Sequence, residues 1–242
     1  MRYAIISDLH SNLDALERVI EDIKKQKVDR HLCLGDIIGY GAQPNECIRL
    51  VREELKCLTI AGNHDWAALG KTNIDYFNAY AKEATLWTRE QLSEDEVKYI
   101  DSLPLIEHLP EDFTLVHGTL YNPELFDYIQ TSYDAYLSLQ ALDGRVCFLG
   151  HSHVPITFFQ GEMISYTLSQ EISLEVGVKA LVNVGSVGQP RDDNPKASYA
   201  IYDTDKRKVW IRRIEYDIES AGKKIRDAGL PEVLAERLKY GR

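Results

Sequence analysis

The sequence predicts an α/β fold that begins with a parallel sheet, and three observations support this. First, five apolar runs have the length of buried strands, at residues 3–7, 30–34, 57–61, 113–116 and 145–149. Second, segments with helical periodicity separate the first three runs, and a β-α-β-α-β order implies parallel strands joined by right-handed crossovers. Third, strand-like segments follow one another closely from residue 145 onward.

The first half of the chain carries clear helix signals. Asn12 is a suitable N-cap for a helix whose apolar positions 13, 16, 19, 20 and 23 lie at helical spacing. A glycine-rich loop, residues 35–41, leads to Pro44, which opens a second helix that extends to about Leu55. Between residues 65 and 110 the pattern is helical, with a capping box at residues 93–96. Residues 76–87 are rich in aromatic side chains and are expected to pack, although a role in shaping a substrate site stays open.

The second half is predicted to be mainly strands, followed by a helical tail. The strand-like segments are 155–160, 171–176, 180–184, 198–203 and 208–215, with a hairpin turn at 203–207. The tail, residues 218–240, is an amphipathic helix interrupted at residues 229–231, where the sequence is Gly-Leu-Pro. No internal repeat or linker is present, so one domain is expected over 1–242, with a helical insertion at about 66–104.

Composition and charge restrict the function classes. The chain has 28 Lys and Arg residues against 38 Asp and Glu residues, a formal net charge of −10. This balance disfavours nucleic-acid binding, which depends on neutralising phosphates, but it permits a phosphate substrate where divalent cations are bound. The four cysteines form no C-x-x-C pair, and no signal peptide or membrane-length apolar run is apparent. A cytoplasmic protein is therefore expected.

Five clusters of metal-type ligands stand directly after the five apolar runs. They are Asp8-Leu-His10, Gly35-Asp36, Gly62-Asn-His-Asp65, His117-Gly118 and Gly150-His-Ser-His153. Carboxylate, amide oxygen and imidazole together suit divalent ions such as Mn²⁺, Fe²⁺ or Zn²⁺. A single histidine is more often structural, but five clusters in order, at strand ends where α/β sheets bind ligands, favour a two-metal site. Residues two apart in a strand share a face, so each D-x-H or H-x-H pair is expected to direct two ligands to one locus.

The order and spacing of these clusters resemble those of the calcineurin-like metallophosphoesterases. The segments 35–41, 44–47, 183–192 and 197–203 are similar to the compact bacterial and archaeal members of that superfamily. The resemblance covers essentially the whole chain. It implies a four-layer α/β/β/α sandwich, in which two mixed sheets are flanked by helices.

The resemblance also implies a ligand set for two divalent metal ions. The first ion would take Asp8, His10, Asp36 and His153, and the second Asp36, Asn63, His117 and His151. Asp36 would then bridge the ions, and Gly35 would let the backbone pass close to them. Two ions about 3.5–4 Å apart would lower the pKa of a shared water and supply a bridging hydroxide. Mn²⁺ is the expected ion, with Fe, Zn, Ni and Co as alternatives.

Four further residues are candidates for catalysis or substrate binding. His64 is expected to protonate the leaving oxygen or to clamp a phosphoryl oxygen. Asp65 would orient His64, or alternatively cap the following helix. Arg191 is a candidate phosphate contact, since its planar fork matches phosphate oxygens, although it could be a surface arginine. Tyr40 would stack on a base or ring, or simply fill its loop. His31 and His108 match no motif and are expected to be structural.

One departure from the pattern of the superfamily narrows the range of expected substrates. Protein serine/threonine phosphatases carry Asp-Arg-Gly where this chain has Gly39-Tyr-Gly41. The acid and the arginine of that motif are absent, so small phosphomono- or phosphodiesters, including nucleotides or dinucleoside polyphosphates, are favoured over phosphoproteins. The expected partner is thus a small-molecule phosphoester, with the oligomeric state open. A nuclease and a non-catalytic scaffold of the same fold are the alternatives; the acidic balance counts against the first and the full ligand set against the second.

Overall fold

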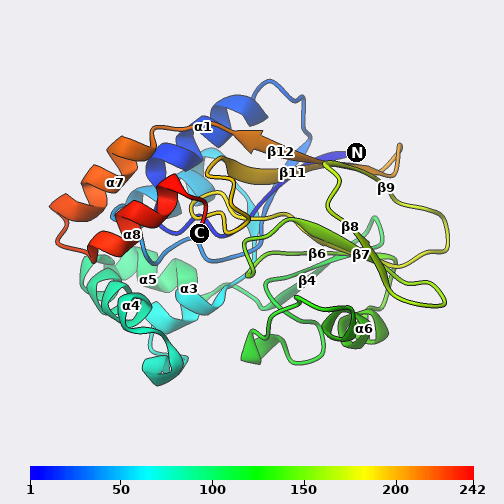
Figure 1. Ribbon diagram of the computed structural model, residues 1–242, viewed down its shortest axis with the longest axis horizontal. Helices are drawn as coiled ribbons and strands as arrows, with labels where there is room; N and C mark the ends of the chain where they lie inside the picture. The colour runs from blue at the N-terminus through cyan, green and yellow to red at the C-terminus, as the bar shows by residue number, and fades with distance from the viewer.

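The computed structural model describes residues 1–242 and contains two six-stranded sheets that lie face to face with helices outside them (Figure 1). The first sheet has the strand order β3 (Leu58–Thr59), β2 (Arg30–Cys33), β1 (Arg2–Ile6), β11 (Ala197–Asp203), β12 (Lys208–Ile214) and β9 (Glu171–Ser173). The second has the order β4 (Ile106–Leu109), β5 (Phe113–Val116), β6 (Val146–Leu149), β10 (Ala180–Asn183), β7 (Ile156–Phe159) and β8 (Ser165–Thr167).

Both sheets are mixed, and each contains a run of three parallel strands. In the first sheet β1, β2 and β3 are parallel, and β11, β12 and β9 continue it with antiparallel pairings. In the second sheet β5, β6 and β10 are parallel, with antiparallel strands at either side. The expected α/β/β/α sandwich of two mixed sheets is therefore confirmed.

Strand alternation builds the core on both faces of the first sheet. Tyr3 and Ile5 of β1 face the second sheet, where Tyr3 meets Phe113 edge to face with ring centroids 5.1 Å apart. Ala4 and Ile6 point the other way, into the cluster formed with α1 (Leu13–Ile23) and α2 (Pro44–Arg49). Because successive side chains of a strand point to opposite faces, one continuous apolar strand supplies two core layers.

The helices form where their caps predict. The Asn12 side chain accepts a hydrogen bond from the amide of Ala15 (3.1 Å), which starts α1, and Pro44 opens α2, which continues as a π-helical turn over Leu50–Glu54. Residues 63–101 contain α3 (Asn63–Ala68), a 3₁₀ turn (Ile74–Tyr76), α4 (Ala79–Gln91) and α5 (Glu94–Asp101). The tail forms α7 (Ile218–Asp227), α8 (Glu232–Glu236) and a 3₁₀ turn (Arg237–Lys239), interrupted as predicted at Gly229 (φ +74°).

Several elements differ from the sequence prediction. Strands β4 and β8, a 3₁₀ turn (Pro123–Leu125) and helix α6 (Ser132–Ala141), which covers the outer face of the second sheet, were not predicted. The predicted strands 57–61 and 171–176 are shorter than expected, because each forms the edge of its sheet and pairs on one side only. None of the helices combines the length and the apolar character needed to cross a membrane.

Candidate metal centre and active site

The seven predicted metal ligands meet where parallel strands of both sheets end. Asp8 and His10 follow β1, Asp36 follows β2, and Asn63 opens α3 just after β3. His117 follows β5, and both His151 and His153 follow β6. Six of the seven are buried, and Asn63 is half-buried. The two sheets therefore contribute to one site, as expected from strand ends that share an edge.

The backbone that carries these ligands is not extended. Asp8, His10, Asp36, His151 and His153 all have positive φ, between +49° and +65°. We expected each D-x-H or H-x-H pair to lie in a strand, where residues two apart share a face. This expectation was wrong, because β1 ends at Ile6 and β6 ends at Leu149, so both pairs lie in the loops that follow. Side chains converge because the loops turn through the left-handed region, which is uncommon for residues other than glycine and concentrates at functional sites.

Distances place Asp36 at the centre of two overlapping groups. Donor atoms of Asp8, His10, Asp36 and His153 all lie within 4.8 Å of one another, and so do those of Asp36, His117 and His151. Oδ2 of Asp36 is 3.7 Å from Nε2 of His10 in the first group and 3.3 Å from Nε2 of His117 in the second. Asn63 joins the second group, because its Oδ1 lies 3.2 Å from His117 Nε2.

Backbone carbonyls fix the direction of three imidazoles. The Nδ1 atom of His10 lies 3.1 Å from the carbonyl oxygen of Ile38, that of His117 lies 2.7 Å from Leu34 O, and that of His153 lies 2.5 Å from Gln189 O. A carbonyl only accepts, so each Nδ1 carries a hydrogen, and in the neutral form of each ring the Nε2 lone pair is directed to the site. This second layer of contacts is typical of histidines that bind metal.

Unsatisfied buried atoms show that the site suits cations. Oδ2 of Asp36 and Nε2 of His151 are buried and have no hydrogen-bond partner. Nε2 of His10 and Nε2 of His153, both directed inward, are only 3.0 Å apart. Buried acceptors that face one another without a donor are costly, and a divalent ion between them would remove that cost. The oxygen and nitrogen set matches borderline ions such as Mn²⁺, Fe²⁺ and Zn²⁺.

Two glycines form the wall against which the carboxylates lie. A Cβ at Gly62 would stand 2.1 Å from Asp36 Oδ1, and one at Gly150 would stand 2.3 Å from Asp8 Oδ2. Gly35 has a different role from the one expected. A Cβ there would clash with the backbone of Gly62 at 2.4 Å, so Gly35 lets two loops approach each other.

Burial and opposed charges shift the pKa values in the metal-free site. The pKa values of Asp8 and Asp36 lie below their usual range. Burial alone would raise these pKa values, but the charges of the adjacent histidines have the larger effect and lower them. Burial lowers the pKa of His117, but the Asp36 and Asp8 carboxylates raise it to about 9. For His151, burial and the charge of His117 lower the pKa to about 3.

Asp65 supports the loops and does not orient His64. Its carboxylate accepts hydrogen bonds from the amides of Asp36 (2.8 Å), Ile37 (3.0 Å) and Gly62 (2.9 Å), with a longer one from Ile38. Nδ1 of His64 is buried without a partner, so the predicted contact between the two side chains is absent. The alternative role, in which Asp65 caps the start of α3, agrees with the hydrogen bond that its carboxylate accepts from the amide of Gly62.

His64 lies between the metal locus and an aromatic wall. Its amide donates to Asp36 Oδ1 (2.8 Å), and its ring lies 5.0 Å from that of His10 and 5.1 Å from that of Phe77. Burial lowers the pKa of His64 to about 4, so the ring is neutral at pH 7 in the metal-free protein.

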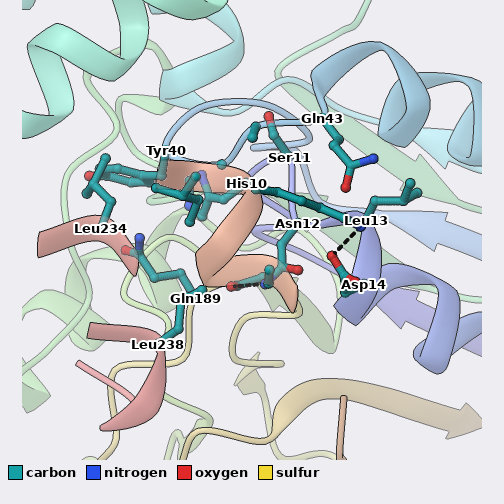
Figure 2. A pocket seen from close by; sticks show the side chains of 16 residues that line it. His10, Ser11, Asn12, Leu13, Asp14, Tyr40, Gln43, Gln189, Leu234 and Leu238 are labelled. Atoms are coloured by element: carbon teal, nitrogen blue, oxygen red, sulfur yellow. Dashed lines mark hydrogen bonds and ion pairs between the residues drawn. The ribbon is translucent and has the colours of Figure 1, made fainter. Parts of the chain in front are cut away.

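Tyr40 fills its loop and packs against the site. Figure 2 shows it next to His10, with Leu234 of α8 beside it. The Tyr40 ring is 4.8 Å from the ring of His10 and 4.5 Å from that of His64, and only 6% of the residue is exposed. These contacts leave little free ring face, so they agree with the loop-filling interpretation.

Arg191 reaches the same region from the 183–192 segment. Its amide donates to the carbonyl of His153 (3.2 Å), and its Nη2 donates to Gln189 Oε1 (2.9 Å) and, at 3.4 Å, to the hydroxyl of Tyr40. It is half-buried, not a freely solvated surface arginine. His31 and His108 lie in strands away from the ligand cluster and bond to Leu55 O and Thr114 Oγ1, as expected for structural residues.

A cavity of about 360 Å³ opens beside the metal locus. Asn63, His64 and His151 line it from the site, and aromatic residues complete the wall: Tyr40, Tyr76, Phe77, Phe126 and Tyr128. Sequence reasoning missed Phe126 and Tyr128, although Tyr128 stacks on His151 with ring centroids 4.0 Å apart. They follow no strand and show no periodicity, so no sequence pattern indicates them.

Comparisons with known proteins agree with this geometry. The family model described as the calcineurin-like phosphoesterase superfamily domain matches residues 1–207. The chain is 45% identical to an uncharacterised protein of Methanocaldococcus jannaschii, over 99% of this chain and 98% of the relative. It is 24% identical to the phosphodiesterase YfcE of Escherichia coli, over 85% of this chain and 89% of that protein.

A solved structure covers the whole chain. The metallophosphoesterase from Sphaerobacter thermophilus is 40% identical and superposes with a TM-score of 0.87, covering 100% of this chain and 99% of its own. The family model and this relative both span the ligand clusters described above. The chain therefore belongs to the calcineurin-like phosphoesterase superfamily and is a hydrolase that acts on phosphoester bonds.

Proposed function

We propose that this protein hydrolyses small phosphomono- or phosphodiesters with two divalent metal ions held around Asp36. The observation that carries the proposal is the position of Asp36 Oδ2, which is buried, unpartnered and shared by two groups of donor atoms. Asp8, His10, Asp36 and His153 would hold one ion, and Asp36, Asn63, His117 and His151 the other. Bound ions would supply positive charge for the phosphoryl oxygens and lower the pKa of an attacking water.

The chain's own residues would position the substrate. His64 lines the cavity as a neutral imidazole, so it can donate a hydrogen bond to a phosphoryl oxygen; to protonate a leaving oxygen it would first have to take up a proton, which the negative charge of a bound phosphate would favour. Arg191 supplies a charged donor near His153. The aromatic wall favours an apolar or aromatic group on the ester, which a nucleoside or an aryl alcohol provides.

The alternatives fit less well. A cavity of about 360 Å³ suits a small molecule, whereas a nuclease would need a groove for the polymer and positive charge along it. The net charge of −10 opposes that. A non-catalytic scaffold would have no need to keep seven ligands and His64 together.

A substrate panel tests the proposal. The protein, supplied with Mn²⁺, should hydrolyse bis(4-nitrophenyl) phosphate, 4-nitrophenyl phosphate or both, and chelation should abolish the activity. Cyclic nucleotides and dinucleoside polyphosphates extend the panel to nucleotide substrates. If the protein binds metal but hydrolyses none of these compounds, the scaffold interpretation replaces the enzymatic one.

A variant of His64 separates its two expected roles, which are a proton donor to the leaving oxygen and a clamp on a phosphoryl oxygen. If His64 protonates the leaving oxygen, His64→Ala should keep both ions but lose rate, by about a hundredfold or more for alkoxide leaving groups. The loss should be small for nitrophenolate, which leaves without a proton. A loss that does not depend on the leaving group, with metal retained, would instead support the clamp on a phosphoryl oxygen.

A further inference from the structure

The segment beyond the part matched by the family model places an arginine close to Tyr40. The family model matches residues 1–207, whereas α7, α8 and the following turn lie within residues 218–239 and are drawn in orange and red in Figure 1. Their apolar residues pack with α4 and with Tyr40 in one cluster. This packing places Arg237, from the final 3₁₀ turn, next to a side chain that contacts the metal locus.

Two guanidinium groups lie close to the ring of Tyr40. The guanidinium carbon of Arg191 is 5.7 Å from the ring centroid, and that of Arg237 is 6.0 Å from it. Gln189 Oε1 accepts hydrogen bonds from Arg191 and holds it in place. Nε of Arg237 donates to the main-chain oxygen of Arg242, and no other hydrogen bond engages the Arg237 side chain.

No carboxylate side chain neutralises this pair. The acids nearest in sequence to Arg191 are taken by other arginines, since Asp192 pairs with Arg213 and Asp193 pairs with Arg242. Burial and the charge of Arg191 lower the pKa of Arg237, as expected when like charges are held together. Two half-buried guanidinium groups with no acidic side chain paired to them form a favourable place for an anion with several oxygens.

We propose that Arg191 and Arg237 bind a second phosphate group of the substrate, so that the preferred substrates are phosphoesters that carry another phosphate. The inference rests on the proposed function and adds a substrate class to it. The reacting phosphate would lie at the Asp36 locus. Tyr40 links this locus to the arginines, because its ring lies 4.8 Å from the ring of His10 and within 6.0 Å of both guanidinium carbons.

Two substrates that differ only in the second phosphate test the proposal. They are adenosine 3′-monophosphate and adenosine 3′,5′-bisphosphate, with bis(4-nitrophenyl) phosphate as a reference that carries no second phosphate. Arg237→Gln should lower kcat/KM for the bisphosphate about tenfold or more and leave the other two substrates within about twofold. Arg237→Lys should restore part of the loss, because it keeps the charge but not the fork.

Arg226→Gln is the matched control. Arg226 lies in the same C-terminal segment and is already paired with Glu232, so its removal should not discriminate between the substrates. Titration calorimetry of the metal-free protein gives a readout that does not need turnover. Arg237→Gln should weaken binding of the bisphosphate and leave binding of the monophosphate unchanged.

The outcomes separate the inference from the proposed function. If wild-type protein hydrolyses bis(4-nitrophenyl) phosphate but gains nothing from a second phosphate, the inference is overturned and the proposed function stands. If Arg237→Gln lowers the melting temperature and affects all substrates equally, Arg237 only packs on Tyr40, and the inference is also overturned. If wild-type protein hydrolyses none of the substrates and binds both adenosine phosphates equally, both proposals are overturned.

Discussion

Replacing Gly62 by alanine should weaken the metal centre through one steric contact. A Cβ at this position would stand 2.1 Å from Oδ1 of Asp36 and 2.4 Å from its amide nitrogen. Ordinary contact begins at 3.4 Å, so either the Asp36 carboxylate or the start of α3 must move by more than 1 Å. The Gly62 backbone has φ −102° and ψ 175°, which alanine adopts freely, so the contact alone accounts for the effect.

The size of the effect follows from the crowded geometry. Overpacking costs about 1–3 kcal/mol, which for a chain of this length lowers the melting temperature by about 3–10 °C. Displacing the shared carboxylate should also reduce metal affinity about ten- to a hundredfold. Thermal melts and a Mn²⁺ titration measure both. Gly222→Ala in α7 is the control, since its nearest atoms lie at 3.5 Å or more and alanine favours the helix. Wild-type metal affinity and stability in Gly62→Ala would refute the reasoning.

Two further predictions concern the carboxylates and His117. Asp36→Asn should lose metal and activity. Asp65→Asn should mainly lower the melting temperature, because a side-chain amide has only one oxygen and cannot accept all the backbone hydrogen bonds that the Asp65 carboxylate accepts. Equal metal loss in both variants would contradict this prediction. His117, whose pKa is raised to about 9 in the metal-free protein, stabilises the fold fully below its unfolded pKa of 6.5 and loses that contribution as the pH rises through 9. Thermal unfolding in the presence of a chelator should therefore show that the free energy of unfolding of the wild type falls by at most about 3 kcal/mol between pH 6.5 and 9, and that this fall is absent in His117→Asn. The same fall in both proteins would contradict the assignment.

Local patterns predicted most of the fold. Apolar runs of strand length, the Asn12 cap and the break at residues 229–231 depend on neighbouring residues, and each is confirmed. Edge strands such as β3 ended early because pairing with a single neighbour depends on the sheet and not on the strand's own sequence. The same limit applies to β8, an edge strand that the sequence did not indicate.

The sequence predicted which side chains come together at the site but not the backbone conformation of the loops that carry them. The structure brings together the side chains that the five clusters predicted as metal ligands, yet the left-handed backbone at Asp8 and His153 was not foreseen. Ordinary propensities disfavour that conformation, and only the surrounding structure maintains it. Tyr128 stacks on His151, and Arg237 lies near the Tyr40 ring, through tertiary packing of distant segments, which no spacing rule reveals.

The meeting of both sheets at the ligand cluster has a consequence for unfolding. Asp8 and Asp36 follow strands of the first sheet, whereas His117 and His153 follow strands of the second, and the candidate ligands extend over 146 positions of the chain. An ion bound between them would act as a reversible cross-link that closes this long loop and fastens one sheet to the other. Separating the sheets would then require release of the ion first. Metal availability would thereby set the lifetime of the folded state as well as the reaction rate.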